Sequence, residues 1–400
     1  MNFCRAMELD GKSRVNPLIL FSVILIGFTA IISQIVLMRE FLIVFYGNEL
    51  CLSFLLANWL ICGAIGSWFL GRFAGRIKSK IIVFSLCQLS LGILLVLTIL
   101  AIRSLKLVLN ITQGSLVPLF IIAVSSFVIL APVCVILGFL WTLSCRVYRI
   151  GSDTESNIAA VKIGKVYILE AAGSIAGGIL CSFFLIRLLN SLQIISILSL
   201  LNILAAFFLL LFSKKSISRF FILIMTAGAF ISGAAIYFFN GWSALEQYSL
   251  KKQWQGYEFI ASRNSIYGNI TVVKRGEQVS FFDNGLRLYT AGDNQPCEEA
   301  VHFNLLEHPN PQDVLLIGGG AGGLIEEVLK HPIKSVDYVE LDPLIIRMAK
   351  DYFPSQYYRP LENDRVMVKN LDGRLFIKTT SQKYDCVIIY LGDPGSLQLN

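Results

Sequence analysis

The chain has 400 residues, enough for two or three domains, of which 55% are hydrophobic and only 15% charged. The net charge of +7 does not indicate nucleic-acid binding. Much of the positive charge lies in short loops between apolar runs, and no basic stripe interleaved with aromatic residues follows residue 240. None of the nine cysteines forms a CxxC pair, so we expect neither a disulfide framework nor a metal site.

Residues 17–240 are predicted to form a transmembrane domain of about seven helices, after a segment 1–16. A span needs about 20 apolar residues. The segments that meet this requirement are 17–38, 49–71, 81–102, 117–140, 165–189, 191–212 and 219–240. They are apolar on all sides, which argues against a soluble helical domain. The first is too long for a signal peptide and is followed by further spans.

Lysine and arginine are concentrated in every second loop. They precede the first span and follow the second, fourth and sixth, whereas the opposite loops hold only Arg39, Arg103, Lys106 and Arg187. The positive-inside rule therefore places residues 1–16 in the cytoplasm. Seven crossings would then place everything after residue 240 on the other side.

Several polar residues lie in or beside the spans. We expect Arg39 and Glu40 to be interfacial, because they follow the first span. Glu170 lies inside the fifth span, where an interhelical hydrogen bond and a role in transport are both open. The spacing of Gly173 and Gly177 predicts a close helix contact.

Residues 241–312 are predicted to form a linker and a small antiparallel β-subdomain. We expect a linker or short helix over 241–260 and strands over 268–274, 278–282 and 285–289. The turn Asp283-Asn284-Gly285 is typical of a hairpin. A helix over 297–307 should lead into the next domain.

Residues 313–400 are predicted to form a Rossmann-like domain with a parallel sheet. Strands over 313–317, 335–341, 365–368 and 383–389 alternate with helical segments. The first strand leads into Gly318-Gly-Gly-Ala-Gly-Gly323, and the second ends in Glu340. This is the full context of a GxGxxG fingerprint.

The expected cofactor contacts all follow the carboxyl ends of these strands, where ligands bind in such sheets. The glycines that let a cofactor approach the backbone are Gly318, Gly319, Gly320, Gly322 and Gly323. Glu340 is placed to accept both hydroxyls of a ribose. Asp372, after the third strand, is placed to meet an adenine amino group.

These residues resemble the spermidine synthase (polyamine aminopropyltransferase) family. The resemblance is carried by GGGAGGLIEEVLKH, VELD, LDG and YDCVIIYLGDP, with SIYGNITVV, FDNG and EEAVHFNLLEHP upstream. QIVLMREFLIVFYGNE, GAIGSWFLGRFAGR and YILEAAGSIAGG resemble, more loosely, the major-facilitator-like helices fused to some bacterial relatives.

The resemblance implies decarboxylated S-adenosylmethionine as the donor, with S-adenosylmethionine as the alternative, and a diamine such as putrescine as the acceptor. It assigns Asp393 to the catalytic loop and Glu298 and His302 to the substrate. It also implies a multi-pass plasma (bacterial inner) membrane protein in a lipid bilayer. Because the cofactor is cytosolic, we expect the soluble domain in the cytoplasm. This disagrees with seven crossings from a cytoplasmic N-terminus, so one of the seven segments would be re-entrant or a further span would be missed. A homo-oligomer is compatible with the sequence.

Four positions depart from the family pattern. Tyr390 stands where the family has its base, and a phenol with a pKa near 10 is a poor base at pH 7. Ala321, Gly268 and Val301 replace an aspartate, a glutamine and a tyrosine. Asp393 could act as the base instead. The alternatives are an S-adenosylmethionine-dependent methyltransferase and a non-catalytic sensor of an adenosyl metabolite.

The predicted sheet stops after its fourth strand, whereas a methyltransferase-like sheet has the order 3-2-1-4-5-7-6. We therefore expect that the chain is a fragment of a longer protein, with a wall of the acceptor pocket missing.

Overall fold

A computed structural model describes residues 17–46, 49–111, 113, 117–149, 156–211, 217–238 and 241–391. The chain divides into two compact units. The helical unit comprises residues 1–41, 51–105 and 117–249. The α/β unit comprises residues 42–50, 106–116 and 250–400, and each unit is described by itself.

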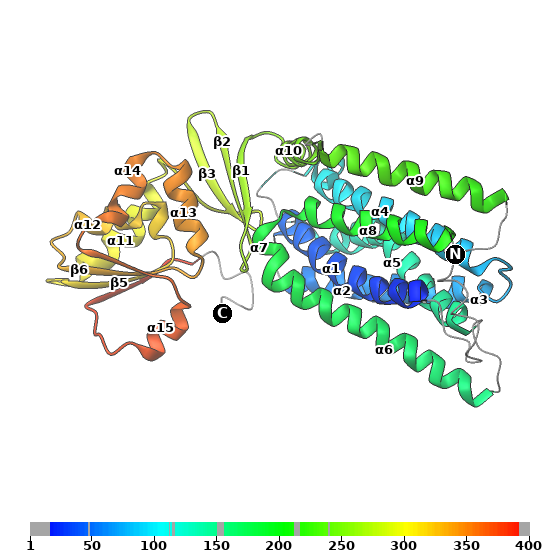
Figure 1. Ribbon diagram of the computed structural model, residues 1–400. Helices are drawn as coiled ribbons and strands as arrows, with labels where there is room; N and C mark the ends of the chain where they lie inside the picture. Colours follow the sequence, from blue (N-terminus) through cyan, green and yellow to red (C-terminus); the bar gives the residue numbers. More distant parts are fainter. Residues whose placement is uncertain are drawn as a thin grey trace, which may run out of the picture. The chain divides into compact units, whose positions relative to one another are not determined.

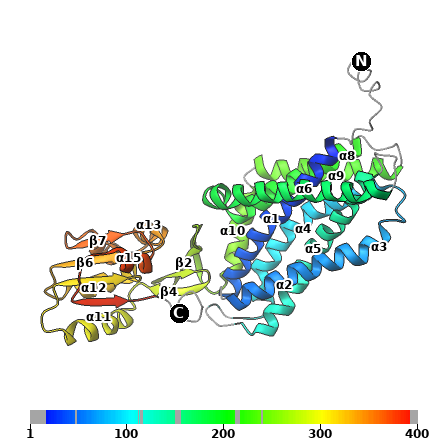
Figure 2. The same ribbon diagram turned by 90° about the horizontal axis from the view of Figure 1, so that it is seen from below.

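Among the described residues, seven helices are long and apolar enough to cross a membrane. The helical elements are α1 (Pro17–Phe45), α2 (Glu49–Ile65), η2 (Gly66–Leu70), α3 (Gly71–Phe73), α4 (Lys80–Val108), α5 (Leu119–Arg149), α6 (Ser156–Leu180), η3 (Cys181–Leu185), α7 (Ile186–Leu188), α8 (Ser191–Leu211), α9 (Ile217–Phe238) and α10 (Gly241–Gln253). The π-helical turns η2 and η3 join α2 to α3 and α6 to α7 into continuous rods. The outer helices α6 and α9 are the least buried of the seven (Figures 1 and 2).

Two helix pairs cross with their backbones in close contact. A Cβ atom at Gly27 of α1 would overlap the carbonyl oxygen of Glu170, and one at Gly173 of α6 would overlap the carbonyl oxygen of Ile24. The close contact predicted from the Gly173 and Gly177 spacing is therefore present between α1 and α6. Helices α2 and α5 cross in the same way, because Gly138 lies against the carbonyl of Gly63.

Glu40 lies near the carboxyl-terminal end of α1, and its side chain is buried among other helices. Arg103 Nε donates to Glu40 Oε2 over 2.9 Å, and Arg103 Nη1 donates to Glu246 Oε2 over 2.6 Å. Arg103 Nη1 also donates to Ser249 Oγ over 2.7 Å. Arg103 and Glu40 are each only 2% exposed. The interfacial position expected for Glu40 stays a prediction, and its ion pair was not predicted because Arg103 lies on a distant helix that a local pattern does not identify.

The α/β unit begins with an antiparallel sheet in the order β1-β2-β3-β4. Its strands are β1 (Glu258–Asn264), β2 (Asn269–Arg275), β3 (Gln278–Asp283) and β4 (Leu286–Thr290). Asn284 and Gly285 have φ angles of 46° and 83°, as the predicted hairpin turn requires. Strand β1 was not predicted, because its residues do not alternate between buried and exposed.

The carboxyl-terminal ends of α1 and α4 belong to this same unit. Ile43 of α1 packs in one cluster with Trp254, Val273 and Phe282. Lys106 of α4 donates to the Tyr46 hydroxyl over 2.7 Å. The antiparallel sheet therefore packs on the carboxyl-terminal residues of α1 that belong to this unit.

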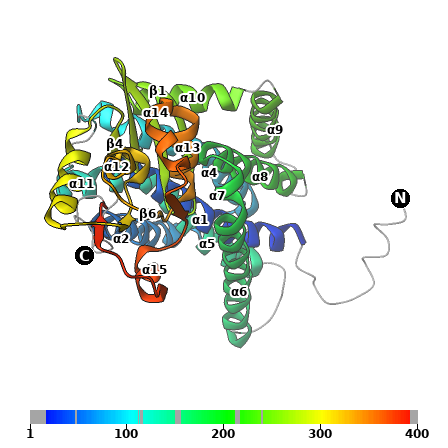
Figure 3. The same cartoon turned by 90° about the vertical axis from the view of Figure 1, so that its left-hand side faces the viewer.

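The second sheet is parallel, with the order β7-β6-β5-β8. Its elements are α11 (Gln295–Glu307), β5 (Asp313–Ile317), η4 (Gly320–Gly322), α12 (Leu324–Leu329), β6 (Ser335–Val339), α13 (Pro343–Tyr352), α14 (Ser355–Tyr358), η5 (Arg359–Glu362), β7 (Val366–Lys369), α15 (Gly373–Thr379) and β8 (Cys386–Ile389). Helices α11 to α14 cover one face and α15 covers the other (Figures 1 and 3). The predicted Rossmann-like sheet is confirmed, with its first four strands in the expected 3-2-1-4 order.

Candidate functional site

The loop after β5 is a glycine cradle, defined by Gly318 to Gly323. Gly318, Gly319 and Gly323 have φ angles of 76°, 71° and 118°, which side-chain-bearing residues rarely adopt. A Cβ atom at Gly320 would lie 2.6 Å from the ring of Tyr338, so the backbone presses directly on that ring. The cradle therefore needs glycine both for its backbone conformation and for space. This is typical of a loop whose backbone lies directly against a bound cofactor.

Glu340 follows β6 and lies buried at the same sheet edge. Tyr338 Oη donates to Glu340 Oε2 over 2.7 Å, and the Asp342 amide donates to Oε1 over 3.3 Å. A carboxylate accepts about four hydrogen bonds, and the Leu341 amide also contributes to this one, so the internal donors leave part of its acceptor capacity open. Burial raises the pKa of Glu340 above its ordinary value. The side chain is thus held in place, and its contact with a ribose stays a prediction.

Asp372 follows β7 and forms the N-cap of α15. Its Oδ1 accepts the amides of Arg374 over 2.8 Å and Leu375 over 3.1 Å. The sequence analysis missed this capping role, which an aspartate directly before a helical segment could have signalled. Contact between Asp372 and an adenine amino group stays a prediction. Oδ2 would make this contact while Oδ1 accepts the two helix amides.

Tyr390 follows β8, and its side chain lies against Gly319, where a Cβ would come within 2.6 Å of the Tyr390 ring. Burial raises the pKa of Tyr390 further above that of a free phenol. A side chain that holds its proton so tightly cannot serve as a base near neutral pH. Asp393, the other expected catalytic residue, lies outside the described residues.

The two expected substrate residues lie on α11. His302 Nδ1 is 2.8 Å from His331 Nε2, and His302 Nε2 is 3.1 Å from Glu327 Oε2. Glu298 is exposed. Among the described contacts, neither side chain meets Glu340 or Tyr390, so their roles toward an amine stay predictions.

Two of the altered family positions are packed into the apolar core. Ala321 and Val301 are both fully buried in the cluster that joins α11, α12 and the parallel sheet. Neither position offers a carboxylate or a hydroxyl to a ligand. The described residues thus include the glycine cradle and Glu340, whereas Ala321 and Val301 contribute to the apolar core.

Tyr289 of β4 was not identified from the sequence, where nothing distinguishes it from other strand tyrosines. A Cβ at Gly322 would come within 2.7 Å of its ring, so it lies under the glycine cradle. Its buried hydroxyl has no hydrogen-bond partner among the described residues. Burial, with Glu340 and Asp283 nearby, raises its pKa well above the ordinary value, so it stays a neutral donor.

Comparison with known proteins identifies the domain. Residues 297–400 match the family model described as the spermine/spermidine synthase domain. Polyamine aminopropyltransferase 1 of Bacillus cereus is 42% identical over 119 residues, which are 29% of this chain and 43% of that protein. The polyamine aminopropyltransferase of Oceanobacillus iheyensis is 26% identical over 242 residues, 59% of this chain and 46% of that protein. That match is longer than the segment after residue 240, so it includes part of the helical region.

Among solved structures, the spermidine synthase of Thermotoga maritima is 29% identical with a TM-score of 0.32, covering 33% of this chain and 48% of that one. The chain spans less than half the length of each of these three proteins. Residues 297–400 therefore carry a spermine/spermidine synthase domain.

Proposed function

We propose that the chain is a membrane-bound aminopropyltransferase that uses decarboxylated S-adenosylmethionine and a polyamine acceptor such as putrescine. The observation that carries the proposal is the buried Glu340 carboxylate, which follows β6 beside the glycine cradle and keeps part of its acceptor capacity open. The family match over residues 297–400 supports the same reading.

The bound cofactor would supply an electrophilic methylene next to a sulfonium. In the transfer, the acceptor nitrogen bonds to this methylene, the carbon–sulfur bond breaks, and its electron pair leaves with sulfur as a neutral thioether. Glu340 would hold the ribose and the cradle would receive the backbone-facing side of the cofactor. The nitrogen must lose a proton, so a base near the carboxyl end of β8 is needed.

Asp393 is our candidate for that base, because Tyr390 holds its proton too tightly. Loss of a general base costs roughly 10²–10⁴-fold in rate, so Asp393→Asn should slow the reaction by that amount at saturating substrate. Tyr390→Phe keeps the ring against Gly319 and should leave the rate within about threefold of wild type, far less than the loss of a base. The reverse ranking of the two variants would remove Asp393 from this role.

The second candidate is a different use of the same cofactor site: a methyltransferase or a non-catalytic sensor. It is favoured by the core position of Ala321, where the family's carboxylate near the donor amine is missing. Calorimetry on the full-length protein separates these readings. The proposal expects tighter binding of decarboxylated than of ordinary S-adenosylmethionine. Preference for the ordinary cofactor would overturn it in favour of a methyltransferase.

We also propose that the seven long apolar helices cross the plasma membrane. Seven crossings, an odd number, would place residue 17 and the residues after 240 on opposite sides of the membrane. Because the cofactor is cytosolic, the soluble domain would lie in the cytoplasm and residue 17 on the external side. The Lys- and Arg-rich loops favour the opposite orientation, and a topology measurement decides between them.

A further inference from the structure

The helical unit contains a cavity of about 340 Å³ between four helices. This volume lies within the range of about 300–1,000 Å³ that small-molecule sites occupy. Helix α1 contributes Ile26 and Ala30, α6 contributes Glu170, and the rest comes from α2, η2 and α5. The remaining lining residues are Trp59, Leu60, Gly63, Ala64, Ser67, Cys134, Leu137, Gly138 and Trp141.

The walls of this cavity are the two close helix crossings. The α1/α6 pair is locked by backbone contact at Gly27 and Gly173, and Ser174 Oγ donates to the Gly27 carbonyl over 3.1 Å. The α2/α5 pair is locked at Gly138, and Thr142 Oγ1 donates to the Ser67 carbonyl over 3.2 Å. Ser67 lies in the π-helical turn η2, a feature frequent at functional sites. The cavity is therefore preformed between rigid walls.

Glu170 is the only charged residue that lines this cavity. It lies seven residues into the apolar segment Ile163–Leu188, roughly 10 Å along the helix. No hydrogen bond or ion pair of its carboxylate is found among the described residues. An unpaired carboxylate at such a position is costly, and it marks a functional site by default.

Two tryptophans, Trp59 and Trp141, line the same cavity from α2 and α5. Indole faces attract cations by about 0.5–2 kcal/mol each, most strongly when water is excluded. A carboxylate with two indoles is the set of groups that recognises an organic ammonium ion. It offers a charge for the nitrogen and apolar surface for the attached carbons.

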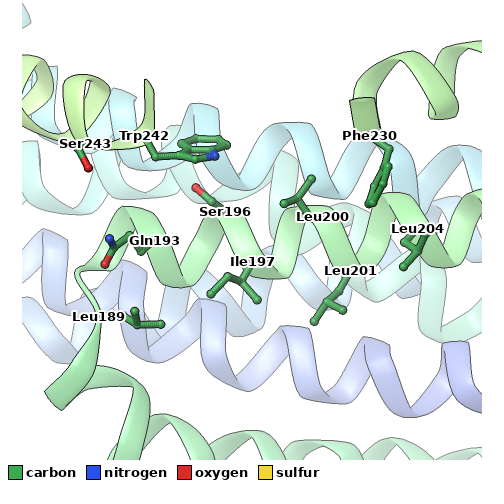
Figure 4. Close-up of a pocket in the computed structure, with 10 residues that line it drawn as sticks. All are labelled: Leu189, Gln193, Ser196, Ile197, Leu200, Leu201, Leu204, Phe230, Trp242 and Ser243. Carbon is green, nitrogen blue, oxygen red and sulfur yellow. The ribbon is translucent and has the colours of Figure 1, made fainter. Parts of the chain in front are cut away.

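A larger cavity, of about 570 Å³, serves as an internal comparison (Figure 4). Leu200, Leu201 and Leu204 of α8 line it together with Phe230 of α9, and no charged residue contributes to it. Its polar Gln193 already accepts the Asn190 amide over 3.1 Å. That cavity suits an apolar chain, whereas the Glu170 cavity combines a charge with aromatic faces.

We propose that the Glu170 cavity binds an organic ammonium ion, with Glu170 as its counter-ion and Trp59 and Trp141 as cation–π partners. The site is separate from the transferase site and does not depend on transferase activity. Its ligand comes either from a free diamine or from the ethanolamine headgroup of a lipid, which share the primary ammonium group.

The test uses the full-length protein in dodecyl maltoside micelles and radiolabelled 1,4-diaminobutane, measured by scintillation proximity. Glu170→Gln should weaken binding by roughly 10–100-fold, the worth of a hydrogen bond to a charged group. Glu277→Gln removes a carboxylate that is 99% exposed and should change nothing. The same Glu170 dependence should persist in a Glu340→Gln background, which separates this site from the cofactor site.

Two further comparisons guard against misfolding and identify the ligand source. Trp59→Phe keeps an aromatic face and should bind more tightly than Trp59→Leu in equally monodisperse protein. Displacement of the label by phosphatidylethanolamine but not by phosphatidylglycerol assigns the site to a lipid headgroup, and no displacement by either assigns it to a free amine; both outcomes support ammonium recognition. Equal binding by wild type and Glu170→Gln overturns the proposal. So does a wild-type protein that retains neither diamine nor phosphatidylethanolamine.

Discussion

Replacing Glu340 with alanine should remove the proposed contact with the two ribose hydroxyls. The carboxylate is held by Tyr338, Asp342 and the Leu341 amide, and its remaining acceptor capacity is open to a ligand. Hydrogen bonds to a charged group contribute about 1.5–3 kcal/mol each. Loss of two such bonds should weaken cofactor binding by roughly 10²–10⁴-fold.

The pH dependence of binding gives this prediction a second, independent readout. Burial raises the pKa of Glu340, and the ionised form is the better acceptor, so cofactor affinity should increase as pH rises through the raised pKa. The folded protein also holds this proton more tightly than the unfolded chain. Glu340 therefore contributes to stability below its unfolded pKa, and this contribution is lost as pH rises toward the folded value. Glu340→Gln should abolish this component of the pH dependence.

Calorimetric titration of the full-length protein with decarboxylated S-adenosylmethionine measures both effects. Glu362→Gln is the matched control, because this exposed carboxylate pairs only with Lys350 at 2.8 Å in the same domain. The control should bind like wild type. Unchanged affinity in Glu340→Ala, in protein with a wild-type thermal transition, would refute the assignment of the ribose site.

Three further predictions follow from the packing. Gly320→Ala places a Cβ atom against the Tyr338 ring and should destabilise the α/β unit by about 1–3 kcal/mol in thermal unfolding. An unchanged stability would show that the cradle shifts to make room for the Cβ atom. Arg103→Met leaves two carboxylates buried without a countercharge and should lower the free energy of unfolding by about 3–5 kcal/mol. A loss of only about 0–1 kcal/mol, as for an exposed ion pair, would show that the network is dispensable. Reporter domains fused at Met1 and Asn400 should report opposite sides of the membrane, and both on one side would contradict an odd number of crossings.

The sequence predicted best those features whose causes are local. The parallel strands are short apolar runs bounded by turns, and the glycine cradle follows from the conformations that only glycine adopts readily. The order β7-β6-β5-β8 followed from alternation of strand and helix together with the family pattern. Strand β1 has no such local signal, because none of its residues is fully buried.

The features that the sequence did not reveal depend on distant pairings. The ion pair of Glu40 was not predicted because Arg103 lies 63 positions away, and Arg103 also binds Glu246, a further 143 positions along the chain. The unpartnered hydroxyl of Tyr289 is visible only once β4 lies under the cradle. The Glu170 cavity likewise exists only where two helix crossings meet.

Aminopropyl transfer itself is tested most directly by mixing the full-length protein with decarboxylated S-adenosylmethionine and putrescine and quantifying the products by mass spectrometry. The account predicts spermidine and 5′-methylthioadenosine in equal amounts, with formation of both lost in Glu340→Ala. Cofactor binding without either product, from putrescine or from any other amine offered, would contradict the account and leave the domain as a sensor.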